Sequence, residues 1–397
     1  MNTQDIKDSK NLNAPSKGNV PALRFPEFTD EWKKIRLGDN CSIQMCKRIM
    51  AAQTNTEGGV PFYKIGTIGG KADAYISKDL FDEYKRKYSY PNKGEVMITC
   101  AGTVGKCIIY DGEDSYYQDS NIVWIDNPNE IISNDFLYHL LSNINWSYLN
   151  STTIVRIYND DLRNLKLCCP RLDEQKKIAR FLSLINERIA TQNRIIEKYE
   201  TLIKGIVELA FNHAATSDTL GCYITQISQH NKTGKDLPVL SVSNKHGFVE
   251  QSEQFEDRII ASDDTSNYKI VSINDFAFNP ARINVGSIAR LKDKECGIVS
   301  PMYICFRTSK DILPEYLELF FKTVTFSSEV GKRLEGSVRL CLSFESLCEI
   351  VIPVISIREQ QSLVKMATAF YSKLDVEKGI LRSYQSQKQY LLSQMFI

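Results

Sequence analysis

The chain has 397 residues, 43% of them hydrophobic and 24% charged, which is typical of a folded protein with room for two or three domains. Its 49 basic and 48 acidic residues give a net charge of +1, so total charge alone does not indicate a nucleic-acid binder. No apolar run approaches a membrane span, and the polar residues 1–20 predict a flexible tail without a signal peptide, hence a cytoplasmic protein.

After this tail, one series of segments occurs twice along the chain. The order is kept throughout, with a sequence offset that drifts from about 177 to 185 residues, and we interpret it as a duplication. The matching pairs are residues 36–44 and 219–227, 60–68 and 237–245, 93–105 and 273–286, and 135–141 and 315–321. Arg156 and Arg339 also match, since each lies 14 residues before its proline, Pro170 or Pro353.

Within each copy, short β-branched and aromatic runs bounded by Gly, Asp and Asn predict strands. Examples are "EVMITC", "KCIIYD" and "NIVWID" in the first copy and "MYICF" in the second. A short helix is expected at about residues 135–142 and again at 315–322. The sequence therefore predicts an α+β fold with two β-rich heads.

Each copy ends in a long helix with a 3.5-residue apolar repeat, which is typical of a coiled coil. The repeat positions are Ile178, Leu182, Ile185, Ile189, Gln192, Ile196, Tyr199, Ile203, Ile206 and Ala210, then Leu363, Ala367, Phe370, Leu374, Glu377, Leu381, Tyr384, Lys388, Leu391 and Met395. Because a polar residue interrupts both stripes at the same place, we expect the two helices to pack on each other. The alternative is that each helix packs only on its own head.

The stretches "CCPRLDEQ" and "IPVISIREQ" mark the change from head to helix. A proline cannot donate a hydrogen bond to a sheet, so we expect it to end the last strand of each head. Asp173 and Glu174 would then place negative charge at the start of the first long helix, where the helix dipole favours it.

No motif for catalysis is evident in the sequence. The loop "CAGTVGKC" at residues 100–107 lacks the glycine spacing and the hydroxyl of a phosphate-binding loop, so a turn between strands is expected. "NPAR" at residues 279–282 lacks the second proline and the aromatic residue of an amino-methyltransferase loop. The 11 cysteines include no C-x-x-C pair, and none of the four histidines has a nucleophile nearby in sequence. We therefore expect no catalytic residue, no metal site and no cofactor.

Polar and basic residues on predicted loops are the candidates for DNA binding, because Asn and Arg can pair with base edges and Lys with phosphates. They are Lys64, Lys85, Arg86, Lys87, Thr103, Lys106, Arg156, Asn244, Lys245, Asn279, Arg282, Asn284 and Arg339. For residues 85–87, which alternate with tyrosines, a solvated loop is an equal alternative, and Arg156 and Arg339 could equally pair with carboxylates.

"PALRFPEFTDEWKKIRLGD" at residues 21–39, together with the repeated helix start, resembles the DNA-specificity subunits of type I restriction–modification enzymes. Residues 101–107 and 279–306 also resemble segments of that family's target-recognition domains. The resemblance implies target-recognition domains at residues 21–170 and 215–353. It also implies spacer helices at residues 171–214 and 354–397, packed as an antiparallel coiled coil with pseudo-two-fold symmetry.

The resemblance further implies a non-catalytic subunit that binds double-stranded DNA at a bipartite site. Each head would read one half of the site, and the helices would set the gap. Two methyltransferase subunits and two restriction (motor-nuclease) subunits would be the protein partners, and S-adenosylmethionine, Mg²⁺ and ATP would belong to them. The alternatives are a self-sufficient DNA methyltransferase or nuclease, and a coiled-coil scaffold without a DNA role.

Overall fold

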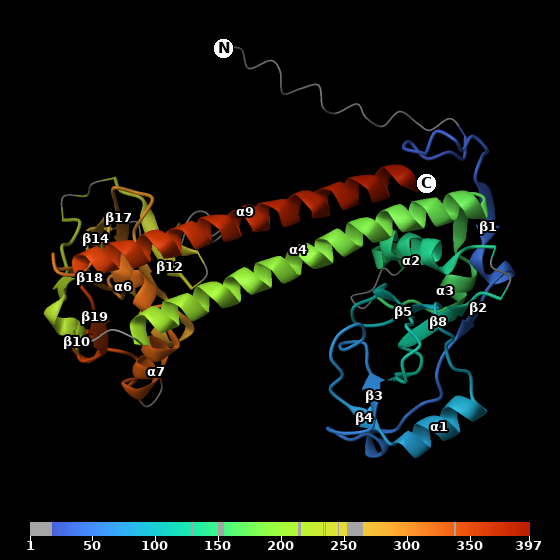
Figure 1. Ribbon diagram of the computed structural model, residues 1–397, viewed down its shortest axis with the longest axis horizontal. Helices are drawn as coiled ribbons and strands as arrows, with labels where there is room; N and C mark the ends of the chain where they lie inside the picture. The colour runs from blue at the N-terminus through green and yellow to red at the C-terminus, as the bar shows by residue number, and fades with distance from the viewer. Residues whose placement is uncertain are drawn as a thin grey trace, which may run out of the picture. The chain divides into compact units, whose positions relative to one another are not determined.

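The computed structural model describes residues 18–128, 131–149, 155–212, 216–232, 234, 236–244, 246–251, 265–336 and 339–397 (Figure 1). Most of the tail expected at residues 1–20 lies outside these ranges, as does Lys245. Contacts within the chain define two units, Met1–Gln192 with Ile380–Ile397, and Asn193–Gly379. Each unit therefore holds one β-rich head and one part of each long helix, α4 (Leu172–Asn212) and α9 (Ile357–Met395).

In unit 1, the described residues of the first head form three sheets. A two-stranded sheet pairs β1 (Lys33–Arg36) with β9 (Lys166–Cys169). A four-stranded sheet has the order β2 (Ser42–Gln44), β8 (Ile122–Asp126), β5 (Val96–Thr99), β6 (Cys107–Ile109), and a three-stranded sheet has the order β4 (Tyr75–Ile76), β3 (Val60–Tyr63), β7 (Tyr116–Tyr117). Its α-helices are α1 (Lys78–Lys87), α2 (Asn134–Asn143) and α3 (Asn159–Arg163), and its 3-10 helices are η1 (Leu37–Asp39), η2 (Ala51–Gln53) and η3 (Trp146–Leu149).

In unit 2, the second head repeats this plan with different lengths. A two-stranded sheet pairs β10 (Thr216–Thr219) with β19 (Val351–Val354). One four-stranded sheet has the order β11 (Ile224–Ile227), β18 (Ile304–Thr308), β15 (Phe276–Phe278), β16 (Ile288–Arg290), and another has β13 (Gly247–Glu250), β12 (Val239–Ser243), β17 (Cys296–Val299), β14 (Lys269–Ser272). The helices among the described residues of this head are η4 (Leu220–Cys222), η5 (Ile283–Val285), α6 (Pro314–Phe320), α7 (Val324–Lys332) and α8 (Phe344–Cys348).

The duplication is visible in the local packing of the two heads. In each head a short antiparallel sheet, β1–β9 or β10–β19, leads directly into a one-turn 3-10 helix. A glycine in that turn, Gly38 or Gly221, lies against the segment that precedes the last strand. A Cβ atom at Gly38 would lie 2.8 Å from the Arg163 carbonyl oxygen, and one at Gly221 would lie 3.1 Å from Cβ of Cys348. Glycine is therefore favoured at the same point of both copies.

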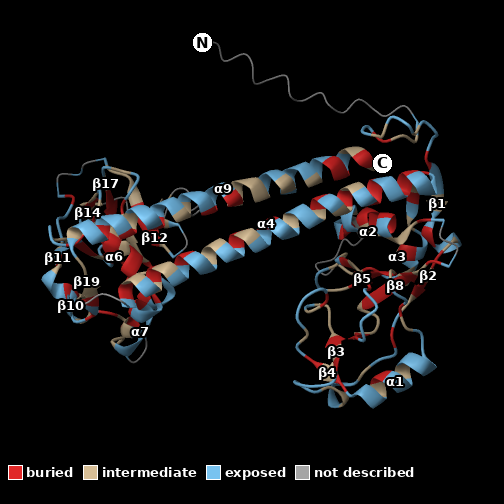
Figure 2. Cartoon of the chain, in the orientation of Figure 1, coloured by how far each residue is buried: buried red, intermediate tan, exposed pale blue. Residues whose placement is uncertain are grey.

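The long helices pack as the repeat predicts. None of the twenty repeat positions is exposed, and Figure 2 shows the buried residues of α4 and α9 on one side of each helix. In unit 1, Ile178 and Leu182 of α4 share one buried cluster with Leu391 and Met395 of α9. The start of α4 thus meets the end of α9, so the pair is antiparallel. The same cluster includes Phe136 of α2, so the helices pack on the head as well as on each other.

The hydrogen bonds of the glutamine explain why the Glu-Gln pair occurs in both copies. Gln175 is 1% exposed: its Oε1 accepts from the backbone N–H of Ser133 at 2.8 Å, and its Nε2 donates to the carbonyl of Pro170 at 2.9 Å. Gln360 is fully buried and makes the same contacts with the N–H of Leu313 at 2.8 Å and the carbonyl of Ile355 at 2.9 Å. Since Ser133 and Leu313 are the N-cap residues of α2 and α6, each glutamine joins the long helix to the short one.

Two local expectations are corrected by the structure. Pro170 follows β9 as expected, but Pro353 lies inside β19, opposite Ser217 of β10. Among the described strands β19 pairs with β10 alone, so the missing N–H of a proline is tolerated. The alternative of a loop at residues 85–87 is also wrong, because these residues form the last turn of α1. Three basic residues at a helix C-terminus are favoured by the helix dipole.

Candidate nucleic-acid interface

In the first head, two of the predicted DNA-binding loops come together. Lys64 begins a turn after β3, in which the Ile68 N–H donates to the Lys64 carbonyl at 2.9 Å. Lys106, at the end of the β5–β6 turn, extends its Nζ to the Ile68 carbonyl at 2.5 Å. Thr103 is exposed on the same β5–β6 turn. Lys64, Thr103 and Lys106 therefore belong to one surface formed by adjoining turns.

Arg156 lies beside these turns. The N–H of Ile157 donates to the Cys100 carbonyl at 2.9 Å, which holds the segment next to the end of β5. The Arg156 guanidinium donates to the carbonyl of Ser120 at 3.4 Å and lies 5.8 Å from the ring of Tyr158, which is 59% exposed. In the first head, therefore, neighbouring segments carry Lys64, Thr103, Lys106 and Arg156.

The basic residues of α1 belong to a different surface. The Lys85 ammonium pairs with Asp114 at 2.9 Å, and Lys87 pairs with Glu83 at 2.7 Å. Lys85 also lies 4.9 Å from the ring of Tyr90. Arg86 is exposed on the same turn. Lys85 and Lys87 are therefore neutralised within the protein, as is Lys64 on the turns, which pairs with Asp73 at 3.1 Å.

The sequence interpretation missed Arg48, which follows β2. Its guanidinium pairs with Asp119 at 2.7 Å while the side chain remains 65% exposed. Arg48 and Lys64 line the same hollow of about 330 Å³ together with Gln118 and Asn121. The available signal was the basic pair in "CKRIM", which stands shortly after the repeated segment at residues 36–44.

In the second head, the matching turns also lie side by side. Asn244 is exposed in the β12–β13 turn, and a Cβ atom at Gly286 would be 3.7 Å from its Cβ. The Ser287 hydroxyl donates to the Val242 carbonyl at 3.1 Å, which ties the β12 end to the loop of residues 279–286. The Leu342 N–H donates to the Pro280 carbonyl at 3.1 Å, so the segment that carries Arg339 joins them.

The predicted residues of the 279–286 loop divide into two groups. Asn279 is 9% exposed, and its Oδ1 accepts from the backbone N–H of Ala281 at 3.1 Å, so it organises the loop. Arg282 and Asn284 are exposed. Within the described residues, the guanidinium groups of Arg282 and Arg339 have no hydrogen-bond or ion-pair partner, whereas Arg290, Arg307 and Arg333 of the same head pair with carboxylates.

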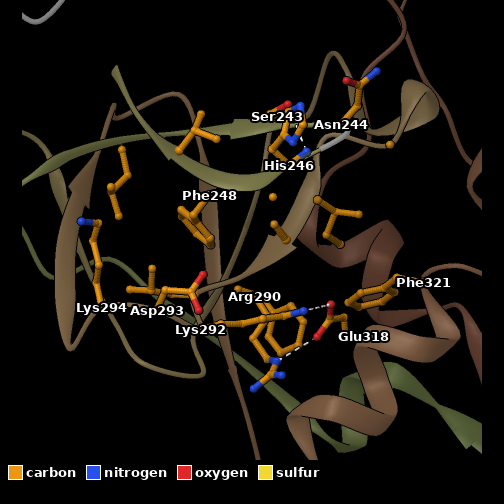
Figure 3. Close-up of a pocket in the computed structure, with 18 of the residues that line it drawn as sticks. Ser243, Asn244, His246, Phe248, Arg290, Lys292, Asp293, Lys294, Glu318 and Phe321 are labelled. Carbon is orange, nitrogen blue, oxygen red and sulfur yellow. Dashed lines mark hydrogen bonds and ion pairs between the residues drawn. The ribbon is translucent and has the colours of Figure 1, made fainter. Parts of the chain in front are cut away.

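A cavity of about 610 Å³ opens beside these loops, between the β12–β13 turn, β16 and α6 (Figure 3). Ser243, Asn244 and His246 lie at one end, and Arg290 and Glu318 lie at the other. The Glu318 carboxylate accepts from Arg290 Nε at 3.0 Å and pairs with Lys292 at 2.5 Å and Lys322 at 3.4 Å.

The charge at Glu318 is fixed by these neighbours. Burial by itself would raise the pKa of Glu318, but the positive charges of Lys322, Lys292 and Arg290 outweigh it, so the net pKa is lowered. Glu318 therefore stays ionised at neutral pH and holds β16, which follows the 279–286 loop, against α6. This ion-pair group supports the loop and leaves Arg290 unavailable for a ligand.

The described part of the chain contains no group of three or more His, Cys, Asp or Glu side chains arranged to hold a metal ion. Nor does any helix within the described ranges have the length and apolar character needed to cross a membrane. What the two heads do present is pairs of adjoining loops with exposed Arg, Lys, Asn and Thr side chains, a donor set suited to the phosphates and base edges of DNA.

Comparison with known proteins shows which proteins this chain resembles. Residues 29–201 match the family model described as "Type I restriction modification DNA specificity domain". Over 180 residues, the chain is 48% identical to a putative type I restriction enzyme specificity subunit of Haemophilus influenzae, covering 45% of this chain and 43% of that protein. Over 195 residues it is 27% identical to the MjaVIII specificity subunit of Methanocaldococcus jannaschii, covering 48% and 43%. The chain thus matches less than half the length of these curated relatives.

Two solved structures share the whole architecture. A structure described as the S subunit of a type I restriction–modification system from M. genitalium has a TM-score of 0.59 at 17% identity, over 95% of this chain and 99% of that chain. A structure from work on assembly of a type I R-M system has a TM-score of 0.55 at 15% identity, over 92% and 97%. The resemblance to type I specificity subunits, and the fold with two β-rich domains and an antiparallel helix pair, are confirmed.

Proposed function

We propose that this chain is the non-catalytic, DNA-reading subunit of a type I restriction–modification complex. The proposal depends mainly on an arrangement of turns that occurs in both heads. Each head brings the same adjoining turns together, from the ends of β3 and β5 in one head and β12 and β15 in the other. Two similar surfaces with different side chains suit two different half-sites of a bipartite target.

Residues 21–170 and 215–353 would act as the two target-recognition domains. In the first, Lys64, Thr103, Lys106 and Arg156 are the proposed contacts, with Lys85, Arg86 and Lys87 in a peripheral role. In the second, Asn244, Arg282, Asn284 and Arg339 are the proposed contacts, joined by Lys245, while Asn279 holds its loop in shape. Arg282 and Arg339 rank highest, because they need not give up an internal ion pair to bind DNA.

Residues 171–214 and 354–397 would be the spacers that set the gap between half-sites. Removing one heptad from each long helix keeps the apolar repeat in register and removes about 10 Å of helix, roughly three base pairs. We expect a gap that is shorter by that amount and unchanged half-sites. An active variant with the original gap would contradict the spacer role.

The partners belong to the same proposal. Two methyltransferase subunits would dock on the helices, two restriction subunits would complete the complex, and S-adenosylmethionine, Mg²⁺ and ATP would be bound by those partners. A cytoplasmic location follows from binding cellular DNA. A self-sufficient methyltransferase or nuclease is the competing function, and saturable S-adenosylmethionine binding by the purified chain, or DNA cleavage by it, would favour that alternative.

The sharpest test of DNA reading uses Arg282→Ala in the assembled complex. If Arg282 reads a base, methylation mapping will show one relaxed position in one half-site, at a cost of about 1–3 kcal/mol. If it contacts a phosphate, binding will weaken equally at all sites and depend less on salt. Lys310→Ala is the matched control, since Lys310 is exposed beyond the other end of β18. Equal effects of both substitutions would refute a role for the loop.

A larger change tests the assignment of one half-site to each head. Exchanging residues 220–352 for the matching head of a relative should replace one half of the methylated sequence and leave the other intact. The measurement is a genome-wide methylation map of cells that express the complex. A map in which both halves changed, or neither changed, would contradict the assignment.

A further inference from the structure

The second head exposes apolar side chains next to its proposed DNA-contacting loop. Val285 is 51% exposed, Met302 is 59% exposed and Leu340 is 51% exposed. Exposure of single apolar residues is common, but Met302 and Leu340 stand on two segments that contact residues 279–280 of the loop that carries Val285. A search for polar residues alone had no reason to select them.

The contacts that bring the three segments together are backbone and side-chain contacts of Asn279 and Pro280. The Asn279 side-chain amide lies 4.0 Å from the Met302 sulfur. Leu340 stands two residues before Leu342, whose N–H donates to the Pro280 carbonyl. Val285 is part of the loop itself, with its N–H donating to the Arg282 carbonyl at 3.2 Å. The apolar side chains therefore share one end of the head with Arg282 and Arg339.

The loop that presents them is held in one shape. Ile283 is 4% exposed and anchors the start of η5, and Gly286 has a φ of 89°, a conformation that favours glycine. The backbone N–H of Ser287 closes the loop on the Arg282 carbonyl at 3.1 Å. Side chains on such a loop are positioned before binding, which is required for contacts as small as one methyl group.

Charge indicates what covers this surface. The two arginines of the head that have no partner within the described residues, Arg282 and Arg339, lie on the same segments as Val285 and Leu340. Unpaired guanidinium groups beside apolar side chains fit a polyanion that also offers small apolar groups. Duplex DNA has this combination in its major groove, where the thymine 5-methyl group is the apolar feature among the base edges.

We propose that Val285, Met302 and Leu340 form a thymine-methyl contact surface that contributes to sequence selection by the second head. The inference rests on the proposed function and adds a class of contact to it. Arg282 and Arg339 attract and orient the duplex, and the apolar side chains distinguish thymine from cytosine by its methyl group.

The test removes the methyl group from the DNA and leaves the protein intact. The DNA duplexes carry the target sequence that methylation mapping identifies. In each duplex, one thymidine of the second half-site is replaced by deoxyuridine, which lacks the 5-methyl group. Binding of the assembled complex is measured by fluorescence anisotropy at fixed salt. We expect at least one replacement to weaken binding about fourfold, the effect of burying one methyl-sized group. Against that duplex, at least one of Val285→Ala, Met302→Ala and Leu340→Ala should lose the discrimination between thymine and uracil.

Ile273→Ala is the matched control, since Ile273 is also 51% exposed but lies at the opposite end of β15, and it should keep the full discrimination. Three results would overturn the inference while leaving the proposed function intact. The complex could bind tightly to every uracil-containing duplex, all three variants could still discriminate thymine from uracil, or the second half-site could contain no A·T pair. Failure of the complex to prefer its target over random duplex would instead refute the proposed function, and the inference with it.

Discussion

In both copies a glutamine at the start of the long helix binds the head in the same way, but the glutamates that precede these two glutamines have different surroundings. Gln175 and Gln360 make matching hydrogen bonds to the N-cap of a short helix. Glu174 is 1% exposed and receives two 2.6 Å bonds from the Arg24 guanidinium, whereas Glu359 is exposed and only caps its own helix through the N–H of Ser356 at 2.9 Å.

The difference comes from residues 19–32, which precede β1. They pack on the long helices of unit 1, where Phe25 contacts the ring of Phe181 and the Leu23 N–H donates to the Gln394 carbonyl at 2.9 Å. This segment covers Glu174 and supplies its partner Arg24. Both copies therefore share the glutamine contacts, because these satisfy buried backbone groups. The burial of the glutamate, in contrast, depends on which segment covers the start of the long helix.

The largest expected effect comes from replacing each of the two glutamates separately. Glu174→Ala leaves the Arg24 guanidinium, whose side chain is only 10% exposed, without its counter-charge, at a cost of about 3 kcal/mol in the stability of unit 1. Glu359→Ala in unit 2 should have a much smaller effect, since it removes one exposed cap. Hydrogen exchange of the amides of each unit measures the two losses separately. Equal losses would mean that the two helix starts are energetically alike.

Acid should also distinguish the units, through His139. This histidine is 2% exposed in α2 and faces Ser183 of α4 at 3.3 Å, with Tyr138 beside it and Lys388 of α9 nearby. Burial, aided by the charge of Lys388, lowers the pKa of His139 to about 4. The matching residue of the second head is the buried Leu319, which does not titrate.

Because the unfolded chain binds the proton near pH 6.5 and the folded unit only near 4, the contribution of His139 is complete above pH 6.5 and is lost as pH falls toward 4. The loss reaches about 3 kcal/mol in unit 1. We expect His139→Leu to abolish this part of the pH dependence, as measured by hydrogen exchange between about pH 4 and 7. An unchanged profile in the variant would assign the acid sensitivity to other groups.

The glutamines should behave alike. Gln175→Ala and Gln360→Ala each leave a buried N–H and two carbonyls without their partner, and each should destabilise its own unit by about 2 kcal/mol. Urea titration followed by hydrogen exchange in each unit gives the two values. Gln361→Ala is the control, since Gln361 is the exposed neighbour of Gln360 on α9, and it should have little effect. A loss confined to one of the two units would show that the shared contacts differ in strength.

The smallest expected effect concerns the charges on the loops proposed to contact DNA. In the first head Arg48 is held by Asp119, while in the second head Arg282 has no partner within the described residues. Asp119→Asn should change stability by less than about 1 kcal/mol, since the Arg48 side chain is 65% exposed and its charge is solvated. It should also strengthen DNA binding and steepen its salt dependence, because Arg48 becomes free to contact phosphate. Weaker binding would show that Asp119 positions Arg48 for its contact.

Periodicity and self-similarity were sufficient to predict much of this fold. The strands at "EVMITC" and "NIVWID", the short helices at residues 135–142 and 315–322, and all twenty seam positions follow from patterns that each segment carries by itself. The segment of α1 was assigned to a loop, because its tyrosines and lysines gave no helical pattern that was recognised. Its burial depends on Phe81, which packs against Tyr90 and Tyr116 from other segments.

For the candidate site, the sequence indicated the loops but not the state of each side chain. Asn279, Arg282 and Asn284 all had suitable chemistry in one short stretch. Only the folded loop shows that Asn279 is occupied by the Ala281 N–H, while Arg282 and Asn284 are exposed. Arg48, Met302 and Leu340 were not selected, because their position beside the loops arises from contacts between distant segments.

The sequence by itself determined the duplication, the α+β heads, the 3.5-residue repeat of the helices and the resemblance to specificity subunits, because these are properties of order and spacing along the chain. The tertiary structure alone decided which glutamate is buried, why the glutamine recurs and which arginines lack a partner within the described residues. Those outcomes depend on segments far apart in the chain, such as Arg24 and Glu174, whose approach no local pattern records.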